Sequence, residues 1–181
     1  MELWDIYDKC FEKTGKLHIR GNKLEAGQFH LVVSIFPINS KNQVLVQKRN
    51  PNLKLMPGEW AATGGSAITG ESPFEAAKRE LKEELGIDAT VENAEMIALF
   101  KRIDSFTSLW VVHIDVDRSE LKLQEEEVAD AKWVTIQEFQ KMVRDGIFHN
   151  YRYMDWLLNY LLYSSVMPQN GTNTCMFTGN K

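Results

Sequence analysis

Residues 65–87 read GSAITGESPFEAAKRELKEELGI, and this stretch carries the most informative pattern in the chain. Ser72 and Glu75 have the spacing of a capping box, in which each side chain bonds the backbone of the other. Pro73 suits the first position of a helix, and Gly86 is the usual left-handed residue that ends one. The stretch therefore predicts a helix over residues 73–85, with tight turns on either side.

Three glutamates of the predicted helix share one face. Glu80, Glu83 and Glu84 stand at positions i, i+3 and i+4, which places their carboxylates side by side. Like charges one turn apart cost a few tenths of a kcal/mol, about 0.2–0.5 per pair, unless a cation lies between them. The opposite face is apolar and can pack on a sheet; it consists of Phe74, Ala77, Leu81 and Leu85. A hard divalent cation such as Mg²⁺ prefers such carboxylate oxygens.

The surrounding residues extend the pattern. Arg79 lies four residues before Glu83 and can hold its carboxylate in one orientation, and Gly64-Gly65 allow close backbone approach to the helix. Three glutamates alone are more often a solvated acidic helix face. The specified positions, however, all fall in register, and they are Gly65, Glu71, Arg79, Glu80, Glu83, Glu84 and Gly86. By composition, such a match arises by chance on the order of once in a million chains.

The stretch from Gly65 to Ile87 is similar to a complete Nudix box at every specified position. The resemblance implies an α/β/α sandwich with a mixed central sheet, and hydrolysis of a nucleoside diphosphate linked to another moiety, X. It implies one to three Mg²⁺ ions, with Mn²⁺ as an alternative. The implied roles are metal ligands at Gly64, Glu80, Glu83 and Glu84, an orienting residue at Arg79 and a supporting carboxylate at Glu71.

Members of the family often add a metal ligand or a base from a later loop. Here the acidic stretch Glu125–Glu127 is the candidate, with Glu127 preferred and Glu126 second. A solvated acidic loop explains any one of these residues equally well. The base that removes a proton from water is therefore left open between Glu83 and this stretch.

The chain outside the motif alternates strands and helices. Strands are expected at 3–7, 17–20, 29–38, 44–48, 97–102, 109–116 and 132–134, with Gly15-Lys16 as the first turn and a loop at 51–57. Thr135 and Glu138 form a second capping box, opening a helix that ends near Gly146. Helical spacing from Met154 to Leu162 predicts a last helix. We expect one domain over residues 1–163 and a loosely ordered tail over residues 164–181.

Composition excludes several classes of function. The 181 residues carry a net charge of −4, which argues against a nucleic-acid surface. Cys10 and Cys175 form neither a disulfide framework nor a zinc pattern, so a reducing, cytoplasmic setting is expected. No segment resembles a signal peptide or a membrane span. The expected partner is a small-molecule diphosphate, and the N-terminal strands are a candidate homodimer interface.

The N-terminal half resembles the isopentenyl-diphosphate-isomerase-like branch of the family. This resemblance rests on residues 3–8, 29–33, 46–49 and 57–60. His30 matches a metal-binding histidine of the isomerases, although a lone histidine in an apolar strand is more often a core residue. The cysteine and the second histidine that isomerases need after the tryptophan are missing from residues 60–67, which disfavours that chemistry. A nucleotide-sensing domain without catalysis is the other alternative.

Three further residues are candidates for substrate binding, together with Gly65 of the motif loop. Lys48 and Arg49 close a strand and can supply positive charge to a phosphate, although a solvated strand end explains them equally well. Trp60 can stack on a base, but packing beneath the motif loop is the preferred interpretation. The sequence does not name X, because specificity in this family comes from loops outside the motif.

Overall fold

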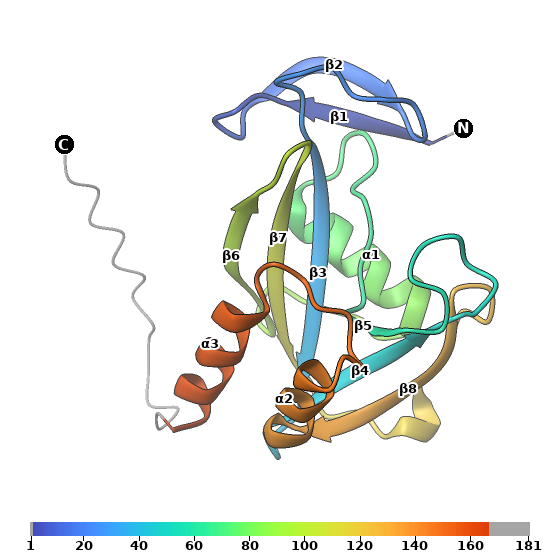
Figure 1. The fold of residues 1–181 in the computed structure, drawn as a ribbon, viewed down its shortest axis with the longest axis vertical. Coiled ribbons are helices and arrows are strands. Elements are labelled where there is room, and N and C mark those ends of the chain that lie inside the picture. Colours follow the sequence, from blue (N-terminus) through green and yellow to red (C-terminus); the bar gives the residue numbers. More distant parts are fainter. Residues whose placement is uncertain (1, 167–181) are drawn as a thin grey trace.

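The computed structural model describes residues 2–166 of the chain. Eight strands, three helices and one short 3₁₀ helix follow one another among these residues (Figure 1). They are β1 (Leu3–Tyr7), β2 (Lys13–Ile19), β3 (His30–Ile38), β4 (Gln43–Arg49), β5 (Trp60–Ala61), α1 (Pro73–Leu85), β6 (Ala94–Lys101), β7 (Ser105–His113), the 3₁₀ helix Arg118–Glu120, β8 (Val128–Thr135), α2 (Ile136–Arg144) and α3 (Met154–Val166).

The main sheet is mixed. Its strands lie in the order β5-β4-β3-β7-β6, and β8 pairs with β4. Strands β3 and β7 run parallel over their whole length, whereas the other pairings are antiparallel. Strands β3 and β4 pair only at Ile38 and Val44. Beyond that point the segment after β5 lies against β3, through bridges at Ile35–Thr63 and Val32–Ser66.

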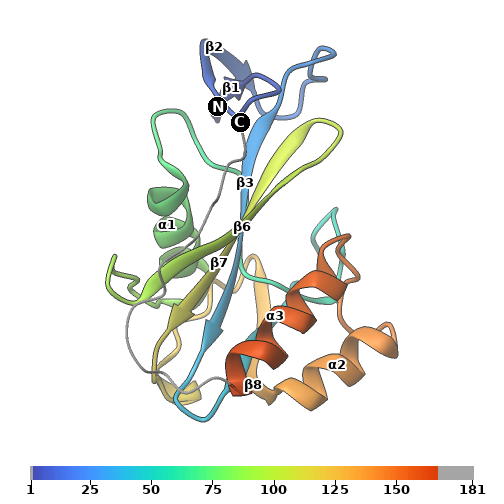
Figure 2. The same ribbon diagram turned by 90° about the vertical axis from the view of Figure 1, so that its left-hand side faces the viewer.

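Two apolar cores lie on opposite faces of this sheet. Successive side chains of a strand point to opposite faces, and β7 accordingly contributes Trp110 to one core and Leu109 and Val111 to the other. The first core contains Leu81 and other residues of α1, whereas the second contains residues of α2 and α3. Figures 1 and 2 show α1 on one side of the sheet and the other two helices across it. The predicted α/β/α sandwich is confirmed.

The helix boundaries follow the local signals. Helix α1 begins after Ser72 with both hydrogen bonds of the capping box, and it ends at Gly86 in the left-handed conformation, with a φ of 74°. Helix α2 begins after Thr135 with a second complete capping box. These features fix where the carboxylate face of α1 starts and stops.

The predicted turn at Gly15-Lys16 is wrong. The chain reverses at residues 8–12, where the Asp8 carboxylate accepts hydrogen bonds from the backbone N–H groups of Cys10 and Glu12. Gly15 instead lies within β2, at a φ of 76°. Between the pairs Asp5–Leu17 and Tyr7–Lys13, three residues of β2 oppose one residue of β1, so the glycine serves a bulge rather than a turn.

The remaining differences are at element ends. Strands β6 and β7 begin several residues before their predicted starts, and the short strand β5 was not predicted. Helix α3 continues to Val166, so it includes the first residues of the predicted tail, and residues 167–181 with Cys175 lie outside the described part. Within residues 2–166 no helix is long and apolar enough to cross a membrane.

Candidate functional site

The three glutamates of α1 share one face but differ in burial. Glu84 faces the sheet and is only 1% exposed. The Glu80 side chain is 12% exposed and the Glu83 side chain 51% exposed. The face therefore runs from solvent at Glu83 to the protein interior at Glu84.

Arg79 holds three carboxylates at once. Its guanidinium donates two hydrogen bonds to Glu71, at 2.6 and 3.1 Å. It also donates to Glu80 Oε1 at 2.9 Å, to Glu83 Oε2 at 3.0 Å and to the Ser66 carbonyl at 3.1 Å. Hydrogen bonding to Glu71, opposed by burial, raises the pKa of Arg79 above its already high value. The expected contact between Arg79 and Glu83 is observed. Glu71 accepts two hydrogen bonds from Arg79 and so holds the guanidinium in place.

Glu84 is fixed by a buried polar chain. Its Oε2 accepts from the Gly64 backbone N–H at 2.9 Å and from the Gln47 side-chain amide at 3.0 Å. The side-chain oxygen of Gln47 in turn accepts a hydrogen bond from the Thr63 hydroxyl at 3.1 Å. Glu84 Oε1 is buried with no hydrogen-bond partner among the described residues. Burial, and then the charge of Glu80, raise the pKa of Glu84 to about 8.

Neighbouring atoms lie too close to Gly64 and Gly65 to leave room for a side chain. A Cβ atom on Gly65 would lie 2.4 Å from Glu80 Oε1. A Cβ atom on Gly64 would lie 2.1 Å from the Val33 carbonyl oxygen, at a φ of +146° that favours glycine. The loop therefore passes directly between β3 and the carboxylates of α1. The Gly64 N–H holds Glu84, and the ligand role predicted for Gly64 falls to its carbonyl oxygen.

Glu127 is the acidic-loop residue whose charge acts on the glutamates. The Gln124 N–H donates to the Glu84 carbonyl at 3.1 Å, which ties the loop to the end of α1. Burial chiefly raises the pKa values of Glu80 and Glu84, and the charge of Glu127 raises both further. Glu127 is half-buried, whereas Glu125 and Glu126 are exposed.

The donor set fits a hard divalent cation, although the side chains are not gathered into a closed cage. No three carboxylate, imidazole or thiol groups in the described part of the chain converge as a ready metal site. The fit rests on Glu84. A buried carboxylate oxygen without a partner is costly, and a cation removes that cost and favours the ionised form. The carboxylate oxygens of Glu80, Glu83 and Glu127 are donors of the kind that Mg²⁺ prefers.

The predicted substrate-binding residues lie on different faces. Arg49 alternates with Gln47 along β4 and so shares the face of Glu84, and its Nε donates to the Leu55 carbonyl at 3.0 Å. Lys48 points to the opposite face, directly across from Trp60. Trp60 packs against the second core, with the Lys132 ammonium 4.3 Å from its ring centroid. The structure brings Gly65 to the glutamates and places Arg49 on the same side of β4 as Gln47, whereas Lys48 and Trp60 lie on the other side.

His30 lies apart from the carboxylates. Its ring stacks on Trp4 of β1, with 4.1 Å between centroids, and its Nδ1 is buried with no partner in the described residues. Burial, the largest cause, lowers the pKa of His30 to about 4. A neutral imidazole packed on an indole ring matches the core interpretation of this histidine.

Gln47 and Thr63 were not among the predicted site residues. Gln47 is 0% exposed in the otherwise apolar run Val44-Leu45-Val46. A polar side chain next to such an apolar run was the available signal in the sequence. It indicates a buried hydrogen bond, because buried polar groups are hydrogen-bonded. Only the fold shows that its partner is Glu84.

Comparisons with known proteins agree with this geometry. The NUDIX domain model matches residues 28–157. A Listeria monocytogenes protein described as an uncharacterized Nudix hydrolase is 39% identical over 160 residues, which cover 88% of this chain and 95% of that protein. An isopentenyl-diphosphate Delta-isomerase of Dinoroseobacter shibae is 34% identical over 163 residues, covering 85% and 87%. A Deinococcus radiodurans crystal structure has the same fold, with a TM-score of 0.72, 21% identity and coverage of 88% and 99%. The chain therefore belongs to the Nudix hydrolase family.

Proposed function

We propose that this chain hydrolyses, with Mg²⁺ or Mn²⁺, the diphosphate linkage of a nucleoside diphosphate joined to a second moiety. The observation that carries the proposal is the buried Glu84 carboxylate, whose Oε1 has no partner within the described residues. The charges of Glu80 and Glu127 act on Glu84, and Arg79 holds Glu80 and Glu83 in place.

The residues that would hold the cation are Glu80, Glu83, Glu84 and Glu127, with the Gly64 carbonyl as a further donor. When bound there, a divalent cation supplies a water of lowered pKa and neutralises charge on the phosphoryl oxygens. A protein of net charge −4 needs such mediation to bind an anionic substrate next to its own carboxylates.

The side chains of this site then have distinct tasks. Arg79 keeps Glu71, Glu80 and Glu83 in one arrangement, so that little reorganisation accompanies the reaction. A carboxylate oxygen of Glu83 or Glu127 takes the proton of the attacking water. One phosphorus–oxygen bond forms while the bond to the bridging oxygen breaks, and the second phosphate leaves.

Isomerisation of an isoprenoid diphosphate is a second candidate, because a relative bearing that name is 34% identical. The residues around the site oppose it. Ala61 and Ala62 are buried apolar side chains just after Trp60, where the isomerase branch has its cysteine. The cysteine within the described residues, Cys10, is exposed in the turn between β1 and β2. This site therefore offers carboxylates but no thiol.

The test is a hydrolysis screen over diphosphate-linked nucleotides, with and without Mg²⁺, of the wild type and the Glu84→Gln variant. The candidates include ADP-ribose, dinucleoside polyphosphates, coenzyme A and dinucleotide cofactors. We expect one or two compounds to be cleaved only with the cation, and the variant to lose most of that rate. Binding without cleavage would establish a sensor instead. Conversion of an isoprenoid diphosphate alone would establish the isomerase.

Comparing Glu83→Gln with Glu127→Gln identifies the base. Removing the base lowers kcat steeply and flattens the acidic limb of the pH–rate profile. Removing a residue that only binds the cation raises the Mg²⁺ concentration needed for half the maximal rate.

A further inference from the structure

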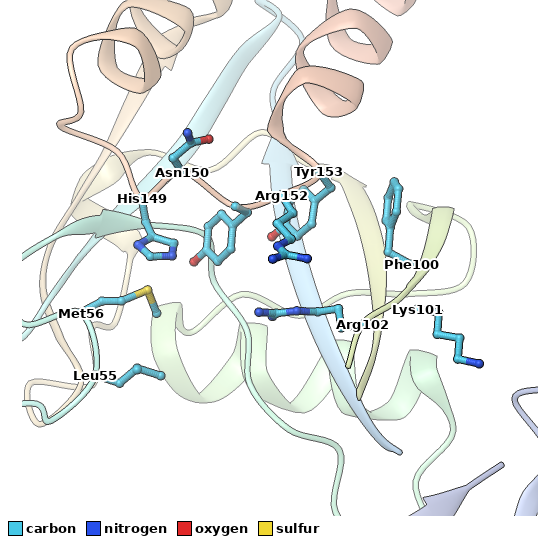
Figure 3. Close-up of a pocket in the computed structure, with 10 residues that line it drawn as sticks. Leu55, Met56, Phe100, Lys101, Arg102, His149, Asn150, Arg152 and Tyr153 are labelled. Atoms are coloured by element: carbon cyan, nitrogen blue, oxygen red, sulfur yellow. The ribbon is translucent and has the colours of Figure 1, made fainter. Parts of the chain in front are cut away.

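A cavity of about 300 Å³ lies between the loop after β4, the end of β6 and the segment that precedes α3 (Figure 3). Leu55 and Met56 line it on the loop side, and Tyr151 and Tyr153 line it from the segment before α3. None of these residues belongs to the Nudix motif. The cavity has the size and the largely apolar walls of a small-molecule site.

The cavity adjoins the glutamates through Tyr151. Burial, and then the charges of Glu84 and Glu59, raise the pKa of Tyr151 to about 12, while a hydrogen bond with the Ala62 backbone opposes the rise. Ala62 comes two residues before Gly64, which holds Glu84. On the loop side, Arg49 bonds the Leu55 carbonyl. Tyr151 therefore connects one wall of the cavity with the loop that holds Glu84.

Another wall of the cavity carries positive charge. The rings of Tyr151 and Tyr153 stack with 5.1 Å between centroids. Burial raises the pKa of Tyr153, and the guanidinium of Arg102 opposes that rise. Tyr151, Tyr153 and Arg102 line the cavity, whereas Glu84 does not. An anion at Arg102 is therefore a different group from a diphosphate at Glu84.

Two guanidinium groups enter the cavity from separate segments. Arg102 follows β6 and Arg152 precedes α3, and Figure 3 shows both directed into the cavity. Neither side chain has an ion pair or hydrogen bond to another described residue, and no Asp or Glu lines the cavity. Two arginines without carboxylate partners attract an anion, and their planar donors match phosphate oxygens.

The neighbouring Lys101 has a different environment, although it also borders the cavity. Its ammonium lies 4.7 Å from the ring centroid of Phe29 and bonds the Lys9 carbonyl at 3.3 Å. Figure 3 shows the side chain directed away from the two arginines. Lys101 therefore offers a matched control, since it carries the same charge next to Arg102 but is directed away from the two arginines.

We propose that this cavity binds the part of the substrate beyond the scissile diphosphate, and that this part carries an aromatic ring and a phosphate group of its own. The ring would lie between the apolar loop residues and the tyrosines, and the phosphate would accept hydrogen bonds from Arg102 and Arg152. The assignment of the diphosphate to the glutamates rests on the proposed function.

The test uses a pair of probes that differ by one phosphate. Binding of adenosine 3′,5′-bisphosphate and of 5′-AMP to the intact protein is measured by calorimetry without divalent cations. We expect the bisphosphate to bind at least about tenfold more tightly, as charge-assisted hydrogen bonds to phosphate predict. The Arg102→Gln/Arg152→Gln double variant should bind both probes alike, whereas Lys101→Gln should keep the wild-type preference.

Equal affinity of the wild type for the two probes would overturn the proposal, as would loss of the preference in Lys101→Gln. These outcomes do not depend on whether the proposed function is correct, because the experiment measures binding and no hydrolysis. If the screen shows hydrolysis, coenzyme A and its 3′-dephospho form should differ in kcat/KM in the same direction. A clear preference in binding without any hydrolysis would remove the proposed function and leave the cavity assignment standing.

Discussion

Glu84 illustrates how a single side chain links folding and function in this protein. Its carboxylate is buried, and burial of a charge is costly unless partners or a metal ion compensate. Two donors reach one oxygen, whereas the other oxygen has no partner in residues 2–164. The pKa of about 8 leaves the group largely protonated at neutral pH without a cation. The fold thus keeps one oxygen available at a fixed place.

Gln47 should control how well Glu84 binds a cation. In Gln47→Met the volume is kept, but Glu84 loses one of its two donors and the Thr63 hydroxyl loses its acceptor. Residues that orient metal ligands typically contribute about 10- to 100-fold in affinity or activity. We expect the Mg²⁺ concentration for half-maximal hydrolysis to rise by about that factor, measured at saturating substrate.

The control is Gln43→Met, at the other end of β4, where Gln43 bonds Asn39 instead of the site. That variant should keep the wild-type dependence on Mg²⁺. An unchanged dependence in Gln47→Met would mean that the Gly64 N–H alone orients Glu84.

At the scale of elements, the decisive contact is between β3 and the loop that follows β5. Backbone hydrogen bonds join Val33 to Gly65 at 2.9 Å and Ile35 to Thr63 at 2.8 Å. The loop therefore extends the sheet, and its other side faces α1. Gly64 contacts the strand and Gly65 contacts Glu80, so the two adjacent glycines serve different neighbours.

Alanine substitutions at these glycines should separate stability from activity. Gly64→Ala places a Cβ against the Val33 carbonyl in a backbone conformation that alanine disfavours, which we expect to cost on the order of 2 kcal/mol or more. Gly65→Ala collides only with the end of the Glu80 side chain. It should retain most of its stability in urea unfolding and lose hydrolysis by at least about tenfold. Wild-type activity in Gly65→Ala would show that the position of Glu80 is not critical.

Local signals account for what the sequence predicted about these elements. Capping boxes at Ser72 and Thr135 are formed by residues three positions apart, so both helix starts were predictable. The turn assigned to Gly15-Lys16 failed because glycine serves bulges as well as turns, and only the pairing with β1 decides between them. The side of the sheet on which Lys48 and Trp60 lie could not be predicted for a similar reason, since it depends on the register of the strand. Arg102 and Arg152 are 50 residues apart in the sequence, so no local pattern predicts that both line one cavity.

At the scale of the whole molecule, the β1–β2 hairpin is a separate sheet that braces the motif loop. Backbone bonds connect Tyr7 with Phe29 at the start of β3. The Asp5 carboxylate accepts from the Gly70 N–H at 2.9 Å and from Lys13, which also bonds the Glu71 carbonyl. The hairpin therefore contacts both the central strand and the residue that supports Arg79. Its docking is part of the site's rigidity.

This docking should weaken in mild acid because of His30. Burial chiefly lowers its pKa from 6.5 to about 4, with His18, Arg102 and Arg20 acting in the same direction and Asp104 opposing them. Between these two pH values the unfolded chain binds a proton that the folded chain does not. The free energy of unfolding therefore has its full value above about pH 6.5. It falls as the pH drops toward 4, by about 2 to 3 kcal/mol in all.

The measurement is urea unfolding at a series of pH values from 7.5 to 4.5, for the wild type, His30→Gln and His113→Gln. Removing His30 should flatten the loss of stability across this window, even if the variant is less stable at every pH. His113 is exposed at the end of β7, so its removal should leave the slope unchanged. If His30→Gln loses stability as steeply as the wild type, another group drives the acid response. The imidazole packed on Trp4 would then be only an apolar contact between the hairpin and the sheet.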